Sequence, residues 1–187
     1  LGQERDNYKS DSIKVRTLYR KGALLIYKQF EEAVKYLNEC AELSIEIDDL
    51  ERYVHTKALM LKIFAHYGRY DEAYLIMKEI DEFLEENTIP DFALSDYYAG
   101  VSRLQGNNGN LLEAKKRIEK AIQLIATDTT HSSLYVSELI ALGVLNNDLG
   151  LVREKETAYL KAEEVTLRYL GEKHVYLTHI YNNLGTV

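Results

Sequence analysis

Apolar residues recur along this chain at helical spacing, in segments that come in pairs. The clearest pair begins near residue 54, where two neighbouring stripes follow one helix. The stripes are Val54, Ala58, Leu61 and Ala65, with Met60, Phe64 and Tyr67 beside them. So broad an apolar face is typical of a helix packed between neighbours. Gly68 then predicts a turn, and a partner helix is expected from about Tyr70 to Glu86.

This pair is one of four similar segments. Each begins at a turn residue, has an apolar residue two places later, and has a marker residue three places after that. The markers are Ala33, Ala73, Ala114 and, as a departure, Lys155, at spacings of 40, 41 and 41 residues. Fixed periods of this size indicate stacked repeat units.

Polar segments separate the units. "DDLE" (48–51) and "TIPD" (88–91) predict capping boxes, in which a side-chain acceptor starts the helix and a carboxylate follows three residues later. Pro90 then falls in a first turn, where its missing N–H costs little. Residues 126–133 form a polar linker, and Gly171 is placed to end a helix. These boundaries divide the chain into helix pairs.

The last residues, "HIYNNLGTV", begin another helical pattern. Ile180, Leu184 and Val187 fall at helical spacing with no capping residue after them. One helix of a repeat cannot bury its apolar face without neighbours. We therefore expect a fifth unit whose second helix lies beyond Val187.

The motif "ALGVLNNDLG" followed by "YLKAEEV" resembles the tetratricopeptide repeat family. Leu142 and Gly143 match the small pair of the first helix, Ala162 matches the later alanine, and Leu184 and Gly185 repeat the pair. The likeness runs from about residue 12 to the end. The period exceeds the ~34 residues usual in the family, and units of this length resemble those of kinesin light chains and bacterial regulators, including cytoplasmic peptide-pheromone sensors.

The resemblance implies an all-α fold, a right-handed superhelical solenoid of antiparallel helix pairs. It implies one domain over residues 1–187, with four full repeats and the first helix of a fifth. The expected repeats are about 12–48, 49–87, 88–127, 129–171 and 173–187.

The resemblance also implies a binding surface. In this family the first helices line a concave groove that holds a peptide or a protein segment, and asparagine amides grip the ligand backbone because an amide both donates and accepts. Asn183 and Asn147 match such positions, and Asn182 lies beside Asn183. By helix register, three more residues are expected to point the same way. These are Tyr98, Lys62 and His55.

Composition narrows the possible partners. A net charge of −7 repels nucleic-acid phosphates, so direct nucleic-acid binding by this segment is not expected. No apolar run reaches the ~18 residues of a membrane span. Cys40 is expected to be a small buried hydrophobe. Among the 15 tyrosines, core positions are expected for Tyr67, Tyr70 and Tyr159, whereas the adjacent Tyr97 and Tyr98 cannot be buried alike.

The sequence offers little that predicts catalysis. His55 and His66 share a helix face, but 11 residues separate them by roughly 16 Å of helix rise, too far to share a metal ion. "GNNGN" (106–110) lacks a following Lys-Ser/Thr that would reach phosphates. We therefore expect no enzymatic activity, no metal and no cofactor.

Three hypotheses follow for function. The first is a protein- or peptide-binding module that senses a ligand for a larger bacterial regulatory protein in the cytoplasm. The second is an assembly scaffold, with self-association as a homodimer through an exposed face at Ile180, Leu184 and Val187. The third is the regulatory domain of a sensor kinase or phosphatase whose catalysis lies outside these residues.

Overall fold

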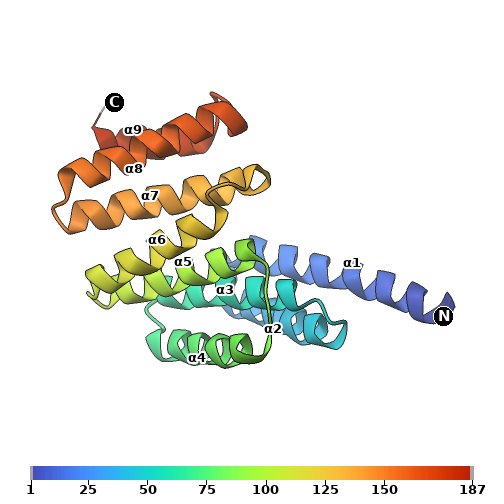
Figure 1. Cartoon of the computed structure of the whole chain (residues 1–187). Helices are drawn as coiled ribbons and strands as arrows, with labels where there is room; N and C mark the ends of the chain where they lie inside the picture. The colour runs from blue at the N-terminus through green and yellow to red at the C-terminus, as the bar shows by residue number, and fades with distance from the viewer. Residues whose placement is uncertain (1, 186–187) are drawn as a thin grey trace. The chain divides into compact units, whose positions relative to one another are not determined.

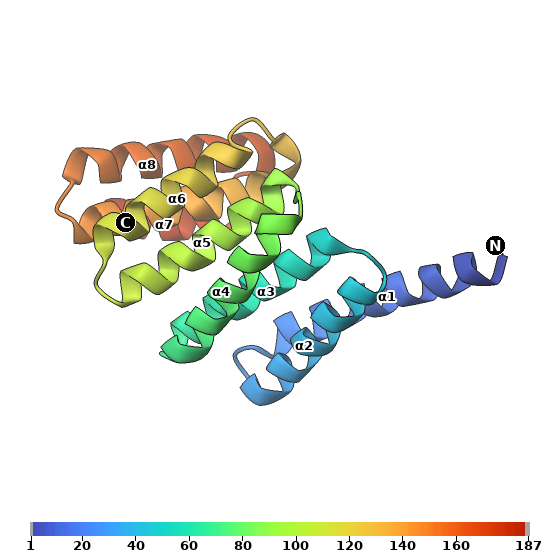
Figure 2. The same ribbon diagram turned by 60° about the horizontal axis from the view of Figure 1, so that its bottom comes forward.

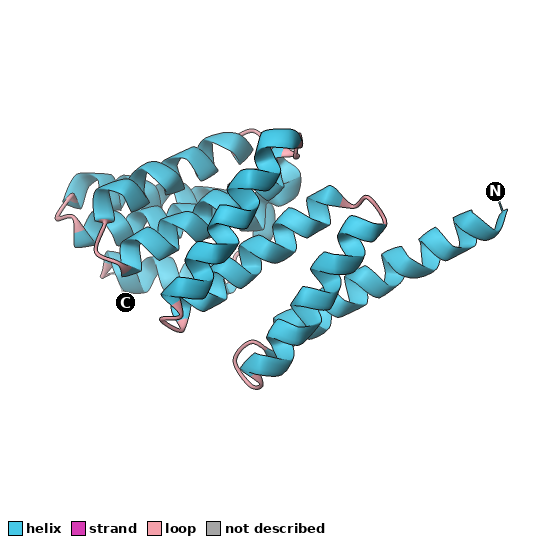
Figure 3. Ribbon diagram, turned by 90° about the horizontal axis from the view of Figure 1, so that it is seen from below, coloured by secondary structure: helices cyan, strands magenta, loops and turns pink. Residues whose placement is uncertain are grey.

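The computed structural model describes residues 2–185, and in them the chain is all-helical (Figure 1). No strand occurs in this range (Figure 3). The α-helices are α1 (Gly2–Leu25), α2 (Phe30–Glu46), α3 (Leu50–His66), α4 (Tyr70–Glu86), α5 (Asp91–Asn107), α6 (Leu111–Ile125), α7 (Ser132–Asp148), α8 (Val152–Val165) and α9 (Val175–Leu184). A 3₁₀ turn, η1 (Thr129–His131), precedes α7, and a π-helical turn, η2 (Thr166–Leu170), extends α8. The predicted all-α fold is confirmed.

The chain forms two compact units. Unit 1 runs to Ala93 and unit 2 begins at Leu94, inside α5. In unit 1, α1 packs on α2, α2 on α3, and α3 on α4 (Figure 2). In unit 2, α6 packs on α7, α7 on α8, and α8 on α9. Sequential packing of neighbouring helices is the architecture of helical repeats, as predicted; the right-handed superhelical path stays a prediction.

The repeat period places the turns as well as the helices. The helix α4 has the predicted bounds, and the first stripe of α3 is completely buried along its length. Gly68, Gly109 and Gly150 close the α3–α4, α5–α6 and α7–α8 turns with φ of 72°, 81° and 73°. A side chain rarely adopts this left-handed conformation, so glycine at each position allows the same sharp turn.

The cap of α3 differs from the predicted capping box. Asp49, not Asp48, caps this helix, and its carboxylate accepts a hydrogen bond from the backbone N–H of Arg52 at 3.1 Å. Asp48 takes φ 59° in the preceding turn, a conformation that aspartate tolerates better than most side chains. The observed cap lies one residue after the predicted one, because Asp48 takes the left-handed conformation of the preceding turn.

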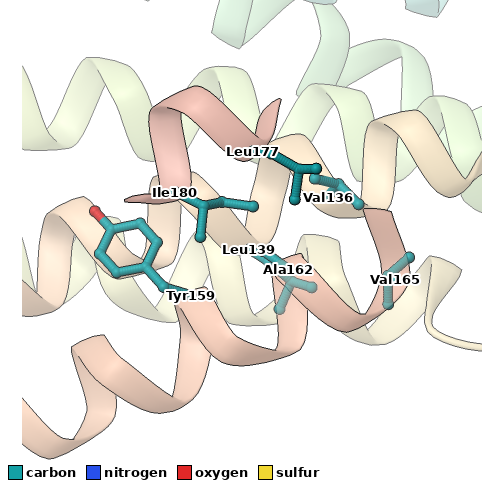
Figure 4. Packing of buried hydrophobic residues seen from close by; sticks show 7 residues of the cluster. All are labelled: Val136, Leu139, Tyr159, Ala162, Val165, Leu177 and Ile180. Atoms are coloured by element: carbon teal, nitrogen blue, oxygen red, sulfur yellow. The ribbon is translucent and has the colours of Figure 1, made fainter. Parts of the chain in front are cut away.

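The core of unit 2 joins three helices. Its buried residues are Val136 and Leu139 of α7, Tyr159, Ala162 and Val165 of α8, and Leu177 and Ile180 of α9 (Figure 4). Ile180 is completely buried, so the prediction that it lies on an exposed, dimer-forming face is wrong. The helices α7 and α8 cover it within the same unit. Leu184 is partly buried, and Val187 lies outside the described residues.

The end of α9 also differs from the expected pattern. Gly185 was expected inside a helix, as Gly143 is, but it caps α9 with φ 74° and donates its N–H to the carbonyl of Tyr181. A glycine in this position can pack inside a helix or cap its C-terminal end. Here it caps the end of the helix.

The tyrosines and the cysteine differ in how deeply they are buried. Tyr159 is completely buried and Tyr97 nearly so, while Tyr98 is half-buried, as expected for adjacent residues. Tyr67 is 44% exposed, contrary to the prediction, and its hydroxyl donates to the carbonyl of Ile26 at 3.0 Å. A polar tip suits this helix edge better than the core. Cys40 is completely buried, and burial raises the pKa of its thiol, as fits a packing role.

Candidate functional site

One face of α7 is exposed near the end of the helix and mixes polar with apolar groups. Val144 is 41% exposed there, and Asn147 and Asp148 are exposed close by. The buried residue Val136 lies 11 residues before Asn147 and shares its helix face, three turns earlier. The exposure of Asn147 therefore reflects its place in the last turn of α7, and not an outward face that runs along the whole helix.

Asparagine amides stand on the exposed sides of two neighbouring helices. Asn147 lies near the end of α7 and Asn182 near the end of α9, and these two helices contact each other. Neither side chain hydrogen-bonds to another group in residues 2–185. Both amides therefore retain a donor and an acceptor for a partner.

Asn183 is exposed as well, but part of its hydrogen-bonding capacity is used locally. Its Nδ2 donates to the carbonyl of His179, one turn earlier in α9, at 2.8 Å. The carbonyl oxygen of its amide remains available as an acceptor. Asn182 is consequently the more open of the two adjacent amides.

Tyr98 faces the second helix of its own pair. The Lys120 ammonium in α6 donates to the Tyr98 hydroxyl at 2.7 Å and lies 4.1 Å from the centre of the ring. A cation held over an aromatic face fixes both side chains. Tyr98 is therefore half-buried against α6 and offers a ligand only part of its surface.

The two remaining candidates lie in unit 1. His55 and Lys62 are seven residues apart on α3 and share a face. The Nε2 atom of His55 lies 2.8 Å from the Tyr19 hydroxyl, and the two rings stack with centroids 5.0 Å apart. Phe92 also contacts the imidazole, at 5.8 Å between centroids. His55 thus sits in an aromatic cluster, and the binding role of all six candidates stays a prediction.

Asn146, the neighbour of Asn147, was not singled out from the sequence. It is only 2% exposed, and its Oδ1 has no hydrogen-bond partner. A signal was present: two repeat periods earlier, at the same position, stands the buried Phe64. A polar residue where the second repeat has a buried aromatic one indicates that this position is not always part of the core.

Two kinds of chemistry have no support in residues 2–185. Among the side chains that the structure describes, residues 9–185, no group of three or more His, Cys, Asp or Glu is placed to hold a metal ion. None of the helices described combines the length and the apolarity that crossing a membrane requires. The surface features above are therefore the basis for a functional proposal.

Comparison with known proteins adds information about the fold. No family model matches the chain, and no curated protein matches it. Among solved structures, it is similar to BtubC (BKLC) from P. vanneervenii, with a TM-score of 0.58 at 18% sequence identity. The match covers 97% of this chain and 64% of BtubC, so the chain spans less than two thirds of that protein's length. At this identity the likeness concerns the fold alone.

Proposed function

We propose that this chain is a non-catalytic module that binds a peptide or a protein segment through the exposed faces of its first helices, α7 and α9 among them. In this proposal it belongs to the tetratricopeptide repeat class and serves a larger cytoplasmic regulatory protein. The observation that carries the proposal is the pair of uncommitted amides, Asn147 and Asn182, on adjacent helices.

The physical argument rests on hydrogen-bond matching. A peptide backbone offers one donor and one acceptor per residue, and an asparagine amide offers the complementary pair. Amides on neighbouring helices grip a backbone at two points, and the exposed Val144, three residues before Asn147 on the same helix, supplies apolar contact. Stacked helix pairs present such side chains on a broad surface, which suits extended partners.

The test replaces the two amides and leaves the fold intact. The chain is immobilised and used to select binders from a displayed library of random short peptides. The double variant Asn147→Ala/Asn182→Ala should bind the selected peptides about tenfold or more weakly, because each lost hydrogen bond removes roughly 0.5–1.5 kcal/mol. Its midpoint of thermal unfolding should change little, since both residues are exposed.

A matched control is Asn38→Ala, an exposed amide on the second helix of the first pair. It should leave peptide binding unchanged. Selected peptides that bind the double variant as tightly as the original chain would refute the role of α7 and α9.

A further inference from the structure

A pocket of about 530 Å³ lies between α6 and α8, with α7 as its floor. Leu139, Leu142 and Asn146 of α7 form the floor. The volume falls within the ~300–1,000 Å³ of typical ligand sites. Asn146 and Val144 are two residues apart, so roughly 200° of helix rotation separates their directions. Asn147 is turned from Asn146 by about 100°, so the pocket and the surface proposed above lie on different faces of α7.

The amide of Asn146 is the least satisfied group in this floor. The residue is almost fully buried, its Oδ1 has no hydrogen-bond partner, and its side chain makes no hydrogen bond within residues 2–185. Buried amides in folded proteins nearly always have partners, because leaving one unpaired costs free energy. Asn146 lines the pocket, so its side chain is the polar group of α7 that a ligand there would meet.

The preceding repeat shows how the fold normally satisfies such a group. One period earlier, Gln105 occupies the position of Asn146, and its Oε1 accepts a hydrogen bond at 3.0 Å from Nδ2 of Asn110. Asn110 is the residue just before α6, and the matching residue before α8 is Leu151. The leucine side chain has no hydrogen-bond donor. The amide is therefore paired at Gln105 and unpaired at the matching Asn146.

Positive charge surrounds the unpaired amide. Lys115 of α6 and Arg153 and Lys161 of α8 line the pocket. Arg153 forms no ion pair in the part of the chain that the structure describes, and it lies in the first turn of α8, where the helix dipole adds positive potential.

The two lysines of the pocket differ in how closely they pair with a neighbouring carboxylate. The Lys115 ammonium is 3.8 Å from the carboxylate of Glu119, a loose contact, whereas Lys161 lies 2.8 Å from Glu164. Glu119 and Glu154 also line the pocket, so three cations face two carboxylates. Arg153 and Lys115 therefore remain the cations most able to pair with an incoming anion.

We propose that this pocket binds an acidic peptide segment. The peptide backbone pairs with the Asn146 amide, a glutamate or aspartate side chain pairs with Arg153 and Lys115, and an apolar side chain rests on Leu139 and Leu142. The amide of the pocket is then paired with a backbone group, its cations with a carboxylate, and its leucines with an apolar side chain. The site is a second binding surface, independent of the exposed amides of Asn147 and Asn182.

The experiment uses nuclear magnetic resonance on the whole chain. The probe is a pool of short synthetic peptides with glutamate at alternate positions and varied apolar residues between them; the control pool has glutamine instead. The side-chain amide signals of Asn146 are identified by their loss in the variant Asn146→Leu. We expect the glutamate pool to shift these signals and the glutamine pool to leave them in place.

Three variants then test the contacts in the binding curve. Arg153→Gln and Lys115→Gln should each weaken binding by about tenfold, as lost hydrogen bonds to a charged group do. Lys116→Gln removes the same charge from the adjacent, outward-facing position of α6 and should change affinity by less than about twofold, as a screened surface charge does. Asn146→Leu has no side-chain amide to observe, so its binding is followed by the backbone amide signals of α6 and α8. Binding should be abolished while the midpoint of thermal unfolding stays equal or rises, because the variant removes an unpaired buried amide.

Several outcomes would overturn the proposal. Equal shifts with both pools would show that the carboxylates play no part. A shift produced by free glutarate alone, with no gain from the peptides, would show a small-anion site instead. A marked loss of stability in Asn146→Leu would assign the amide a structural role. Binding that is lost in Asn147→Ala/Asn182→Ala but kept in Asn146→Leu would place the peptide on the other face of α7 and leave the proposed function standing.

Discussion

Phe64 in unit 1 and Asn146 in unit 2 occupy the same repeat position, two periods of 41 residues apart. Phe64 is 5% exposed, packs edge-on against Phe30, and lies 4.9 Å beneath the guanidinium of Arg69. Asn146 is buried as deeply, but its side chain makes no hydrogen bond. One framework position is therefore filled by a packed ring in unit 1 and by an unpaired amide in unit 2.

The residue that precedes the second helix decides between the two outcomes. In unit 1 this residue is Arg69, which covers Phe64 and is held by Glu31 and Glu72 at 3.0 and 2.6 Å. The matching residue in unit 2 is Leu151. The arginine with two carboxylate partners covers Phe64, whereas the leucine has no polar group that could pair with the Asn146 amide.

The second helices of the two units also differ in charge at one matching position. Glu79 of α4 and Lys161 of α8 are also two periods apart. In unit 1 the Tyr53 hydroxyl donates to Glu79 at 2.7 Å and Lys57 donates to it at 2.9 Å, so the carboxylate is satisfied within the fold. The matching position therefore carries a carboxylate paired within the fold in unit 1 and a cation that lines the pocket in unit 2.

The largest expected effect comes from removing the packed ring in unit 1. Phe64→Ala should lower the free energy of unfolding by about 3–5 kcal/mol, since it removes a buried ring and leaves a cavity beneath Arg69. Urea denaturation followed by circular dichroism measures the change. Asn146→Leu is the matched substitution in unit 2 and should not destabilise the chain; similar losses in both variants would erase the comparison.

A smaller effect is expected from close packing in unit 2. A Cβ added at Gly143 would lie 2.6 Å from the ring of the buried Tyr159, so Gly143→Ala should cost about 1–3 kcal/mol. Gly22→Ala in unit 1 would place its Cβ 2.7 Å from Cγ and Cδ2 of the buried Leu37 and 3.2 Å from the carbonyl oxygen of Ala33, so it should cost a similar amount.

Gly106→Ala is the control for these glycine variants. Its nearest neighbour would be a methyl group of Leu145 at 3.5 Å, an ordinary contact. Alanine is the better helix former, so stability should rise by about 0.5–1 kcal/mol. Thermal unfolding of the three variants, measured side by side, would contradict this ranking if Gly143→Ala were the mildest.

The smallest effect distinguishes a paired hydroxyl from an unpaired one. Tyr53→Phe removes the donor to Glu79 and should cost about 1 kcal/mol, whereas Tyr159→Phe removes a buried hydroxyl that has no hydrogen-bond partner and should cost nothing. Equal costs would show that the hydroxyl of Tyr159 is satisfied in solution.

The same two variants have a pH signature. Burial raises the pKa of both tyrosines, and the hydrogen bond to Glu79 raises that of Tyr53 further. Since the folded pKa lies above the unfolded value, their neutral forms add stability that is complete below about pH 10 and declines as the pH rises beyond it. Each phenylalanine variant should flatten that decline in urea denaturation between neutral and alkaline pH.

The sequence predicted the periodic part of the fold and missed its exceptions. The bounds of α4, the buried stripe of α3 and the glycine turns follow from spacing alone, because burial on a helix repeats with its geometry. Asn146 could not be assigned in this way. Whether its amide has a partner depends on Leu151, five residues later in the chain, and on α6 and α8 beside it.

The errors at the end of the chain have the same origin. Ile180 carries the correct spacing for an apolar face, but spacing does not say which neighbours cover that face. Asn147 and Asn182 are exposed, and their binding role stays a prediction. The local sequence pattern therefore predicted which face of a helix is apolar. Contacts between helices determined which side chains of that face are covered.

The glycine turns have a consequence for how this chain can be enlarged. Gly68, Gly109 and Gly150 share one backbone conformation and stand 41 residues apart. A copy of the segment from Asn110 to Gly150, inserted directly after Gly150, would start and finish at equivalent turns. Such an in-frame duplication preserves every local junction, so an array of this kind can lengthen by whole units without the design of a new connection.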